Sequence, residues 1–331
     1  MSQMMKACLV DESNNLYWGE VEKPACGSDE LLVRVHATAV NRADLQQKEG
    51  TYPVPPGASP ILGLEMAGTI EEKGELVTDW NIGDRVMALL SGGGYAQYVV
   101  IKADTAIRVP EELHLEQAAS IPEVYLTSYL NMIQLGGLSS GERVLIHAAA
   151  SGVGTASIQL AKTVGAQVYA TAGSNEKIEA VKELGADLAI AYKEQSFRDI
   201  VLKETGGHGV ELVLDPIGAA YWQDNMEVLA LDGRMVLYGT MGGSKIDQVD
   251  LMPAMLKRIH LIASTLRGLP HERKVALKNE FEERVMPKFR SGEMIPVIDS
   301  VYEPFEVNEA HARMKSNQNI GKLVVRVPSP K

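Results

Sequence analysis

A short run of small residues, Ala150-Ser-Gly-Val-Gly154, joins an apolar stretch of strand length to a segment with helical spacing. Small side chains allow a phosphate group to approach the backbone amides and the positive end of a helix closely. We therefore predict that this turn binds a dinucleotide pyrophosphate, although a tight turn also needs glycine for structural reasons and the strict G-x-G-x-x-G spacing is absent. The residues concerned are Ser151, Gly152, Val153 and Gly154.

The residues after the next apolar stretch indicate which nucleotide binds. A site for NAD places an acidic residue at the end of the second strand, where it accepts hydrogen bonds from the ribose 2′-hydroxyl. Here that place holds "TAGSNEK", residues 171–177, with no carboxylate before Glu176. A hydroxyl, amides at a helix start and an ammonium attract a 2′-phosphate, so Gly173, Ser174 and Lys177 predict NADPH. Alternatively, Ser174 is only a helix N-cap and Lys177 only a solvated helix residue.

From Glu123 onward, apolar runs of strand length alternate with helix-length segments. This pattern is typical of a parallel sheet wound with crossover helices, so we predict an α/β fold with a Rossmann-type, doubly wound, six-stranded parallel sheet. One crossover helix is expected to end at Gly165, and the next to begin after Ser174 and end at Gly185. The six runs begin at Val144, Gln167, Asp187, Glu211, Arg234 and His260.

The chain before this sheet is rich in strand-like alternation and turns, as in "ELLVRVHATAV" and "GDRVMALLSGGGYAQYVVI". After Arg267 we expect one amphipathic helix over residues 271–289, followed by the strand-like tail "GKLVVRV". Two domains are therefore predicted: a β-rich domain of residues 1–122 and 267–331, and a nucleotide-binding domain of residues 123–266.

Composition excludes several classes of protein. With 331 residues, 45% hydrophobic and 23% charged, the chain is typical of a soluble globular protein with two cores. The formal net charge of −11 leaves no basic face for nucleic acid, so nucleic acid is not an expected partner. Cys8 and Cys26 are expected to be free thiols. The apolar run Ala7-Cys-Leu-Val is too short for a signal sequence or membrane span, so we expect a cytoplasmic protein without a membrane partner.

Several longer stretches span nearly the whole chain, among them "AVNRADLQQKEGTYPVPPGASPILGLEMAGTI", "QAASIPEVYLTSY", "LDPIG" and "NQNIGKLVV". With these stretches the chain resembles the zeta-crystallin-type quinone oxidoreductases of the medium-chain dehydrogenase/reductase superfamily, and most of all the branch that contains the tumour-suppressor-induced quinone oxidoreductase. The resemblance implies two domains, a GroES-like β-rich catalytic domain formed by both ends of the chain, and a homodimer formed through the sixth strand of the parallel sheet.

Zinc-dependent members of the superfamily carry ligands at positions that the resemblance assigns to other residues here. Asn41 and Glu123 stand where those members have cysteines, and Leu64 stands where they have the histidine of Gly-His-Glu. An amide and an apolar side chain cannot complete a zinc site, so no metal is expected. Hydride transfer to a quinone or a conjugated enone needs less electrophilic help than alcohol oxidation, because such an acceptor disperses the developing charge itself.

The resemblance also implies further site residues. Asn41 and Tyr52 would contact the substrate and the nicotinamide as hydrogen-bond donors, and Tyr192 would contact the adenosine phosphate. Each has a plainer alternative, as a helix cap for Asn41 and as packing for the two tyrosines. Residues after the fifth and sixth strands are expected to line the nicotinamide, because open α/β sheets bind ligands at that edge. These are Gly239, Met241, Ser264 and Leu266.

Two other polar residues are expected to be buried. Glu65 lies in the apolar stretch "ILGLEMAG", where a carboxylate needs a partner, and Arg85 or Arg42 would serve. His147 lies within the first strand of the sheet and is expected to be a hydrogen-bonded core histidine.

The leading hypothesis is an NADPH-dependent quinone oxidoreductase that transfers hydride directly, without metal or flavin. An NADPH-dependent alkenal/enone double-bond reductase differs from it only in acceptor geometry, and a non-catalytic NADPH-binding protein is the third possibility. The rates of NADPH consumption with a quinone and with a simple enone distinguish the three.

Overall fold

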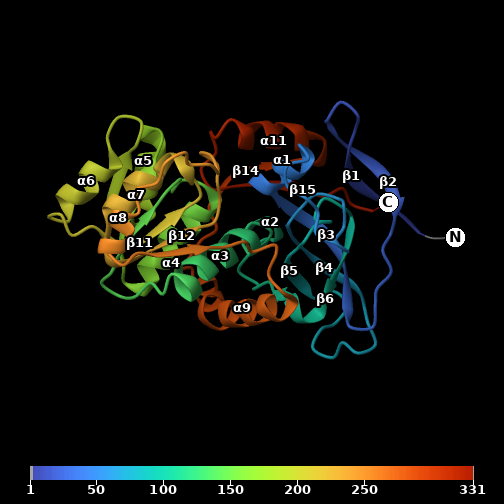
Figure 1. Cartoon of the computed structure of the whole chain (residues 1–331). Coiled ribbons are helices and arrows are strands. Elements are labelled where there is room, and N and C mark those ends of the chain that lie inside the picture. The colour runs from blue at the N-terminus through green and yellow to red at the C-terminus, as the bar shows by residue number, and fades with distance from the viewer. Residues whose placement is uncertain (1–2, 331) are drawn as a thin grey trace. The chain divides into compact units, whose positions relative to one another are not determined.

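The computed structural model describes residues 3–330. The chain forms two compact units, which we call the first unit (Met1–Leu126 with Arg267–Lys331) and the second unit (Thr127–Leu266). Their helices and strands are shown in Figure 1. Among residues 3–330, none of the helices combines the length and apolar character that crossing a bilayer requires.

The second unit is built on a six-stranded parallel sheet with strand order β10-β9-β8-β11-β12-β13. The chain starts in the middle at β8, winds to one edge and then returns to β11, so the winding reverses between β8 and β11, where such sheets bind nucleotides. The predicted doubly wound sheet is confirmed. Its strands are β8 (Arg143–Ile146), β9 (Gln167–Ala172), β10 (Leu188–Ala191), β11 (Val210–Asp215), β12 (Leu229–Leu237) and β13 (His260–Ala263). The helical segments are η2 (Leu130–Leu135), α4 (Gly152–Val164), α5 (Asn175–Glu183), α6 (Phe197–Glu204), η3 (Ala219–Tyr221), α7 (Trp222–Val228) and α8 (Met252–Leu256).

The ends of the first two crossover helices follow from their capping residues. Ser174 is the N-cap of α5, and its hydroxyl accepts the backbone N–H of Lys177. Gly165 ends α4 with φ of 84°, and Gly185 follows α5 with φ of 108°. Both glycines adopt a left-handed conformation that disfavours residues with a Cβ atom. The predicted helix boundaries are confirmed.

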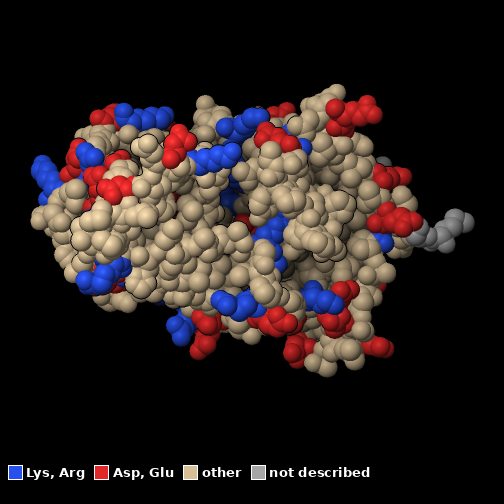
Figure 2. Space-filling view, in the orientation of Figure 1, with Lys and Arg blue, Asp and Glu red and all other residues tan. Residues whose placement is uncertain are grey.

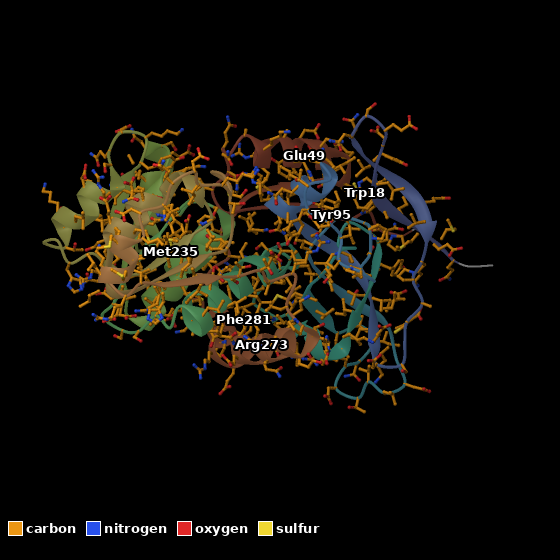
Figure 3. The ribbon with its side chains drawn as sticks, viewed as in Figure 1. Trp18, Glu49, Tyr95, Met235, Arg273 and Phe281 are labelled. Carbon is orange, nitrogen blue, oxygen red and sulfur yellow. The ribbon has the colours of Figure 1, made fainter. Side chains whose placement is uncertain are left out.

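The core of the second unit is mainly apolar, and it encloses a hydrogen-bonded histidine. Met235, labelled in Figure 3, and Val213 are fully buried between the sheet and its helices. His147 is also fully buried, with its Nδ1 3.1 Å from Thr171 Oγ1 and its Nε2 2.8 Å from Asn225 Oδ1. Burial lowers the pKa of His147 to about 4, so the ring is neutral and structural, as predicted.

The first unit contains a seven-stranded sheet of order β14-β15-β3-β4-β5-β7, with β6 also paired to β3, and the hairpin β1-β2. Strand β15 pairs antiparallel with β3, so the last strand of the chain belongs to the same sheet as strands from its first part. The strands are β1 (Met4–Val10), β2 (Leu16–Glu22), β3 (Glu30–Val40), β4 (Glu65–Lys73), β5 (Arg85–Leu89), β6 (Tyr98–Lys102), β7 (Ile107–Arg108), β14 (Ile298–Tyr302) and β15 (Lys322–Arg326). The helices are α1 (Arg42–Lys48), η1 (Ala103–Thr105), α2 (Leu115–Ala118), α3 (Pro122–Tyr129), α9 (His271–Arg284), α10 (Met286–Arg290), η4 (Pro304–Glu306) and α11 (Val307–Lys315).

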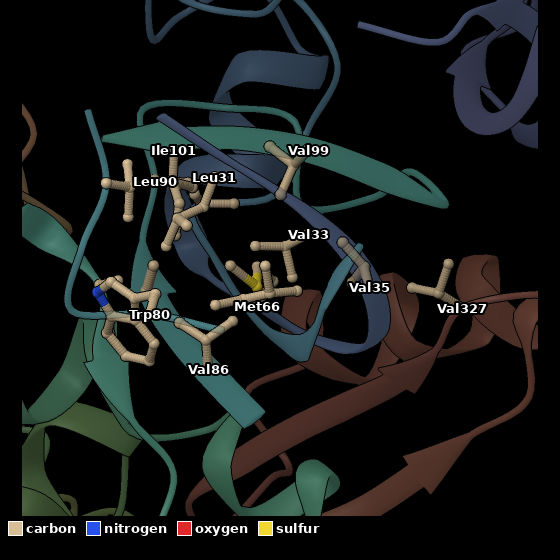
Figure 4. Packing of buried hydrophobic residues seen from close by; sticks show 14 residues of the cluster. Leu31, Val33, Val35, Met66, Trp80, Val86, Leu90, Val99, Ile101 and Val327 are labelled. Atoms are coloured by element: carbon tan, nitrogen blue, oxygen red, sulfur yellow. The ribbon is translucent and has the colours of Figure 1, made fainter. Parts of the chain in front are cut away.

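Alternating side chains of β3, β4 and β5 form the main core of the first unit, shown in Figure 4. Val33, Met66 and Val86 meet there with almost no exposed surface, and Trp80 covers one side. The sheet thereby gives a rigid support for the residues that follow the strands.

Two expectations for the end of the chain need correction. The predicted helix over residues 271–289 is two helices, α9 and α10, because Pro287 lacks the N–H that a continuous helix would use. The segment between this pair and the tail also forms β14 and α11, which the apolar pattern did not predict.

Charged side chains of both signs are interspersed on the face of the molecule shown in Figure 2. Ion pairs with exposed or partly exposed side chains include Arg326 with Glu116 and Lys315 with Glu49. Exposed pairs of this kind contribute little to stability.

Candidate functional site

The turn from β8 to α4 has the features of a phosphate site. The Ser151 hydroxyl accepts the N–H of Gly154 at 3.1 Å, whereas the N–H groups of Gly152 and Val153 have no protein acceptor among residues 3–330. The first turn of α4 carries no acidic residue. A Cβ atom on Gly154 would lie 2.4 Å from the carbonyl oxygen of Ala149, so only glycine allows the helix to start this close to the strand. Open amides and the helix N-terminus together fit a pyrophosphate.

The end of β9 brings together the residues predicted to select the nucleotide. Ser174 is exposed, and the Tyr192 hydroxyl lies so close to Gly173 that a Cβ atom there would be 2.9 Å from it. The Tyr192 N–H donates to the carbonyl of Ala172 at 3.3 Å, which fixes the tyrosine beside this strand end. Lys177 is half-buried in the first turn of α5. Gly173, Ser174, Lys177 and Tyr192 thus form one group, and the Ser174 hydroxyl serves also as the helix cap.

The loops after β12 and β13 contain the remaining residues expected near a nicotinamide. The N–H of Met241 donates to Pro216 at 3.0 Å, and the N–H of Ser264 donates to Leu237 at 3.0 Å, so both loops are held at the ends of neighbouring strands. A Cβ atom on Gly239 would lie 2.9 Å from the carbonyl oxygen of Pro216. Met241 is exposed and Leu266 is buried.

In the first unit, Asn41 follows β3 and precedes α1, with 8% of its surface exposed. Its Nδ2 group donates to Glu65 Oε1 at 3.0 Å and to the Ala39 carbonyl at 3.2 Å, while its Oδ1 accepts from Lys322 Nζ at 2.6 Å. Both amide hydrogens are therefore engaged, and only a lone pair of Oδ1 remains. The expected role of Asn41 as a donor does not fit this geometry, which leaves it an acceptor.

The buried partner of Glu65 is Lys322, not Arg85 or Arg42 as expected. Glu65 has no exposed surface, and its Oε1 lies 2.7 Å from Lys322 Nζ. Arg85 donates to the carbonyls of Pro110 and Leu113, and Arg42 donates to the Met314 carbonyl at 2.9 Å. This pair has no local signature near Glu65, because Lys322 belongs to β15, the last strand of the chain.

Glu65 also holds the start of α3. Its Oε2 accepts the backbone N–H of Glu123 at 2.8 Å, so the two oxygens of one carboxylate connect Asn41 with Glu123. The Glu123 side chain is of intermediate exposure, and its carboxyl forms no hydrogen bond within the described part of the chain. Burial, and next the negative charge of Glu65, raises the pKa of Glu123 to about 8, against the opposing charges of Lys322 and Arg267.

Tyr52 and Arg267 contact each other, and the charge of Glu123 acts on the Tyr52 hydroxyl. The Arg267 guanidinium carbon is 5.0 Å from the centre of the Tyr52 ring, within the range of a cation–π contact. Arg267 is 7% exposed; its Nη2 donates to the Ser91 carbonyl at 2.7 Å and to Gln47 Oε1 at 2.8 Å, while its Nη1 is buried without a partner in the described residues. Burial and the charge of Glu123 raise the pKa of Tyr52, so its hydroxyl stays protonated and can donate.

The donor set does not suit zinc. The ammonium of Lys322 already binds Glu65 and Asn41, and a metal ion at these atoms would be repelled by it. Residues 3–330 contain no group of three or more His, Cys, Asp or Glu side chains placed to hold a metal ion.

Two family profiles match the chain, one described as the alcohol dehydrogenase GroES-like domain over residues 27–111 and one as zinc-binding dehydrogenase over residues 152–285. The quinone oxidoreductase of Sus scrofa is 30% identical over 313 residues, which are 92% of this chain and 92% of that protein. The chain belongs to the quinone oxidoreductase-like proteins of the medium-chain dehydrogenase/reductase superfamily.

Other medium-chain dehydrogenase/reductase proteins show the breadth of the family. The synaptic vesicle membrane protein VAT-1 homolog of Danio rerio is 32% identical over 92% of this chain, which spans only 65% of that protein's length. Among solved structures, the enoyl reductase CurK is 27% identical, with a TM-score of 0.87 over 98% of this chain and 99% of its own. A mycobacterial protein complexed with NADPH is 26% identical, with a TM-score of 0.87 over 98% of this chain and 100% of its own. The chain is thus an oxidoreductase with an NAD(P)-binding fold.

Proposed function

We propose that the protein is an NADPH-dependent reductase of quinones that needs neither metal nor flavin. The observation that carries this proposal is the nucleotide site of the second unit, which lacks an acidic residue after β9. Within the first unit, the buried ion pair of Lys322 with Glu65 leaves no place for zinc, which supports a reaction without metal. Bound NADPH would supply a hydride. The similarity to the quinone oxidoreductase of Sus scrofa supports the quinone as acceptor.

The residues of the chain then have defined tasks. The amides of Gly152 and Val153 bind the pyrophosphate, and Ser174 with Lys177 binds the 2′-phosphate. Tyr52 donates a hydrogen bond to a quinone oxygen. Asn41 Oδ1 can only accept, so it would bind a donor such as the carboxamide N–H of the nicotinamide and not the quinone. A planar quinone disperses the charge that hydride transfer creates, so these few polar contacts suffice.

The acceptor class is tested by comparing initial rates of NADPH oxidation with an ortho-quinone and with a simple enone. We expect the quinone to be reduced faster. The likeness to the enoyl reductase CurK supports the second candidate, an enone double-bond reductase, and a faster rate with the enone would replace the first proposal by this one. NADPH binding without oxidation of either acceptor would favour a non-catalytic NADPH-binding protein.

Lys177→Ala tests the choice of NADPH over NADH. Removing the ammonium should weaken NADPH binding by about tenfold or more and leave NADH binding unchanged, because a hydrogen bond to a charged group contributes about 1.5–3 kcal/mol. Fluorescence titration with each nucleotide measures both affinities. Lys182→Ala, on the exposed side of the same helix, is the matched control and should keep the preference. Equal affinities of the unaltered protein for both nucleotides would refute the assignment.

We also propose a homodimer formed through β13. This strand is at the edge of the sheet and pairs only with β12 among the described residues, and Leu261 on it is 52% exposed. Exposed apolar side chains continue along the preceding helix α8, which includes Met255 and Leu256. An unpaired strand edge beside apolar side chains is suited to pairing with a second copy.

Leu261→Lys is expected to convert the dimer to a monomer, because a buried ammonium would face its symmetry mate in the interface. Light scattering after gel filtration gives the mass of each species. Leu76→Lys, which alters an exposed leucine of the first unit, should leave the dimer intact. A monomeric unaltered protein would contradict the proposal.

A further inference from the structure

Reduction of a quinone or an enone requires a proton as well as a hydride, and the proposed function leaves the source of this proton unassigned. Hydride addition to a quinone yields a hydroquinone anion, and addition to an enone yields an enolate. Either anion must receive a proton before the product leaves as a neutral molecule. The group that delivers it must hold a proton near neutral pH and be open to the acceptor and to solvent.

Most acidic groups of the first unit near Asn41 and Tyr52 do not meet these conditions. Asp44 is buried, and its two oxygens accept the N–H groups of Asn41 and Gly63 at 2.8 and 3.0 Å, so it cannot turn toward a ligand. Glu65 has both oxygens engaged by Lys322, Asn41 and the Glu123 amide. Tyr52 has a raised pKa and is therefore a poor proton donor, although it can still form a hydrogen bond.

Glu123 meets both conditions. Its backbone is fixed by the 2.8 Å hydrogen bond to Glu65, whereas its carboxyl forms no hydrogen bond within residues 3–330, and the residue as a whole is of intermediate exposure. Tyr52 lies close enough for the charge of Glu123 to affect its pKa, and the same holds for Lys274. The free carboxyl is therefore within electrostatic range of Tyr52, the side chain that we assign to the acceptor oxygen.

We propose that Glu123 is the general acid of the reaction and protonates the reduced acceptor. The bond between the Glu123 carboxyl oxygen and its hydrogen breaks, and a new O–H bond forms on the hydroquinone anion, or a C–H or O–H bond on an enolate. NADPH provides the hydride with its two electrons and is oxidised, while the acceptor is reduced by two electrons. The Glu123 carboxylate then regains its proton from solvent.

The charges around Glu123 support its role as the general acid. The pKa of about 8 keeps most of the Glu123 carboxyl protonated at pH 7, and a general acid is most effective when its pKa lies near the working pH. The inference rests on the proposed function, because it assigns the second half of the same reaction. The charged and titratable groups that act on Glu123 or respond to it are Asp44, Tyr52, Glu65, Arg267, Lys274 and Lys322.

Glu123→Gln tests the proposal with little change in shape, because the amide keeps the backbone hydrogen bond to Glu65. We expect kcat/KM for quinone reduction to fall by about 100-fold, within the usual range for loss of a general acid, with unchanged NADPH affinity. The acid form predominates below its pKa, so the rate of the unaltered protein should decline as pH rises through about 8. The variant should lack this decline. Glu112→Gln, which removes an exposed carboxylate, should behave as the unaltered protein does.

A second measurement does not depend on turnover. Carbon NMR of the nucleotide-free protein with labelled glutamate carboxyls should show one signal that titrates near pH 8 and is missing in Glu123→Gln. The proposal is overturned if no glutamate titrates above its ordinary range, or if the variant keeps both the rate and the pH profile. If no quinone or enone supports NADPH oxidation by the unaltered protein, the proposed function itself is overturned. A fully active Glu123→Gln variant would overturn only the role of Glu123.

Discussion

Lys322→Met should lower the free energy of unfolding by about 3–5 kcal/mol, the usual effect of removing one partner of a buried ion pair. The methionine fills a similar volume but leaves the Glu65 carboxylate, which has no exposed surface, without its cation. The variant also loses the 2.6 Å hydrogen bond that orients the Asn41 amide. Urea unfolding followed by circular dichroism measures the loss.

The double variant Glu65→Gln with Lys322→Met is the matched control. It removes both charges, so no buried carboxylate remains unpaired, and it should recover most of the lost stability. If the single variant is as stable as the unaltered protein, or the double variant is no more stable than the single one, then the ion pair of Lys322 with Glu65 does not stabilise the first unit.

Gly154→Ala is expected to have the largest effect on the nucleotide site. The new methyl group would lie 2.4 Å from the Ala149 carbonyl oxygen and 2.6 Å from that of Ala148, and both are backbone atoms that cannot move aside alone. The start of α4 must therefore shift away from β8, at a cost of about 1–3 kcal/mol in stability. The same shift misplaces the open amides of Gly152 and Val153, so NADPH binding should weaken by about tenfold or more.

Calorimetric titration with NADPH and thermal unfolding of the same samples test this expectation. Thr163→Ala, near the other end of α4, is the control and should bind NADPH normally. Normal NADPH affinity in Gly154→Ala would show that the turn from β8 to α4 does not bind the pyrophosphate.

Local features were readable from the sequence wherever the relevant interactions are short in range. The alternation of strands with helices identified the parallel sheet, and Ser174, Gly165 and Gly185 marked helix ends because caps act within one turn. Pro287 carried the signal that breaks the helix after Arg284, although the amphipathic pattern extends across it.

The centre of the first unit could not be read in the same way. Glu65 was recognisable as a buried carboxylate from its apolar neighbours, but its partner comes from β15, which reaches it only through the pairing of β15 with β3. The orientation of the Asn41 amide depends on that same partner. The family resemblance therefore suggested a donor, whereas the tertiary contacts leave only the amide oxygen of Asn41, which accepts.

Quinone reduction without a metal is tested by following NADPH oxidation by the purified protein with an ortho-quinone in the presence of a strong metal chelator. We expect turnover well above the rate in buffer and undiminished by the chelator. Turnover that disappears with the chelator, or that never exceeds the rate in buffer although NADPH binds, would contradict it.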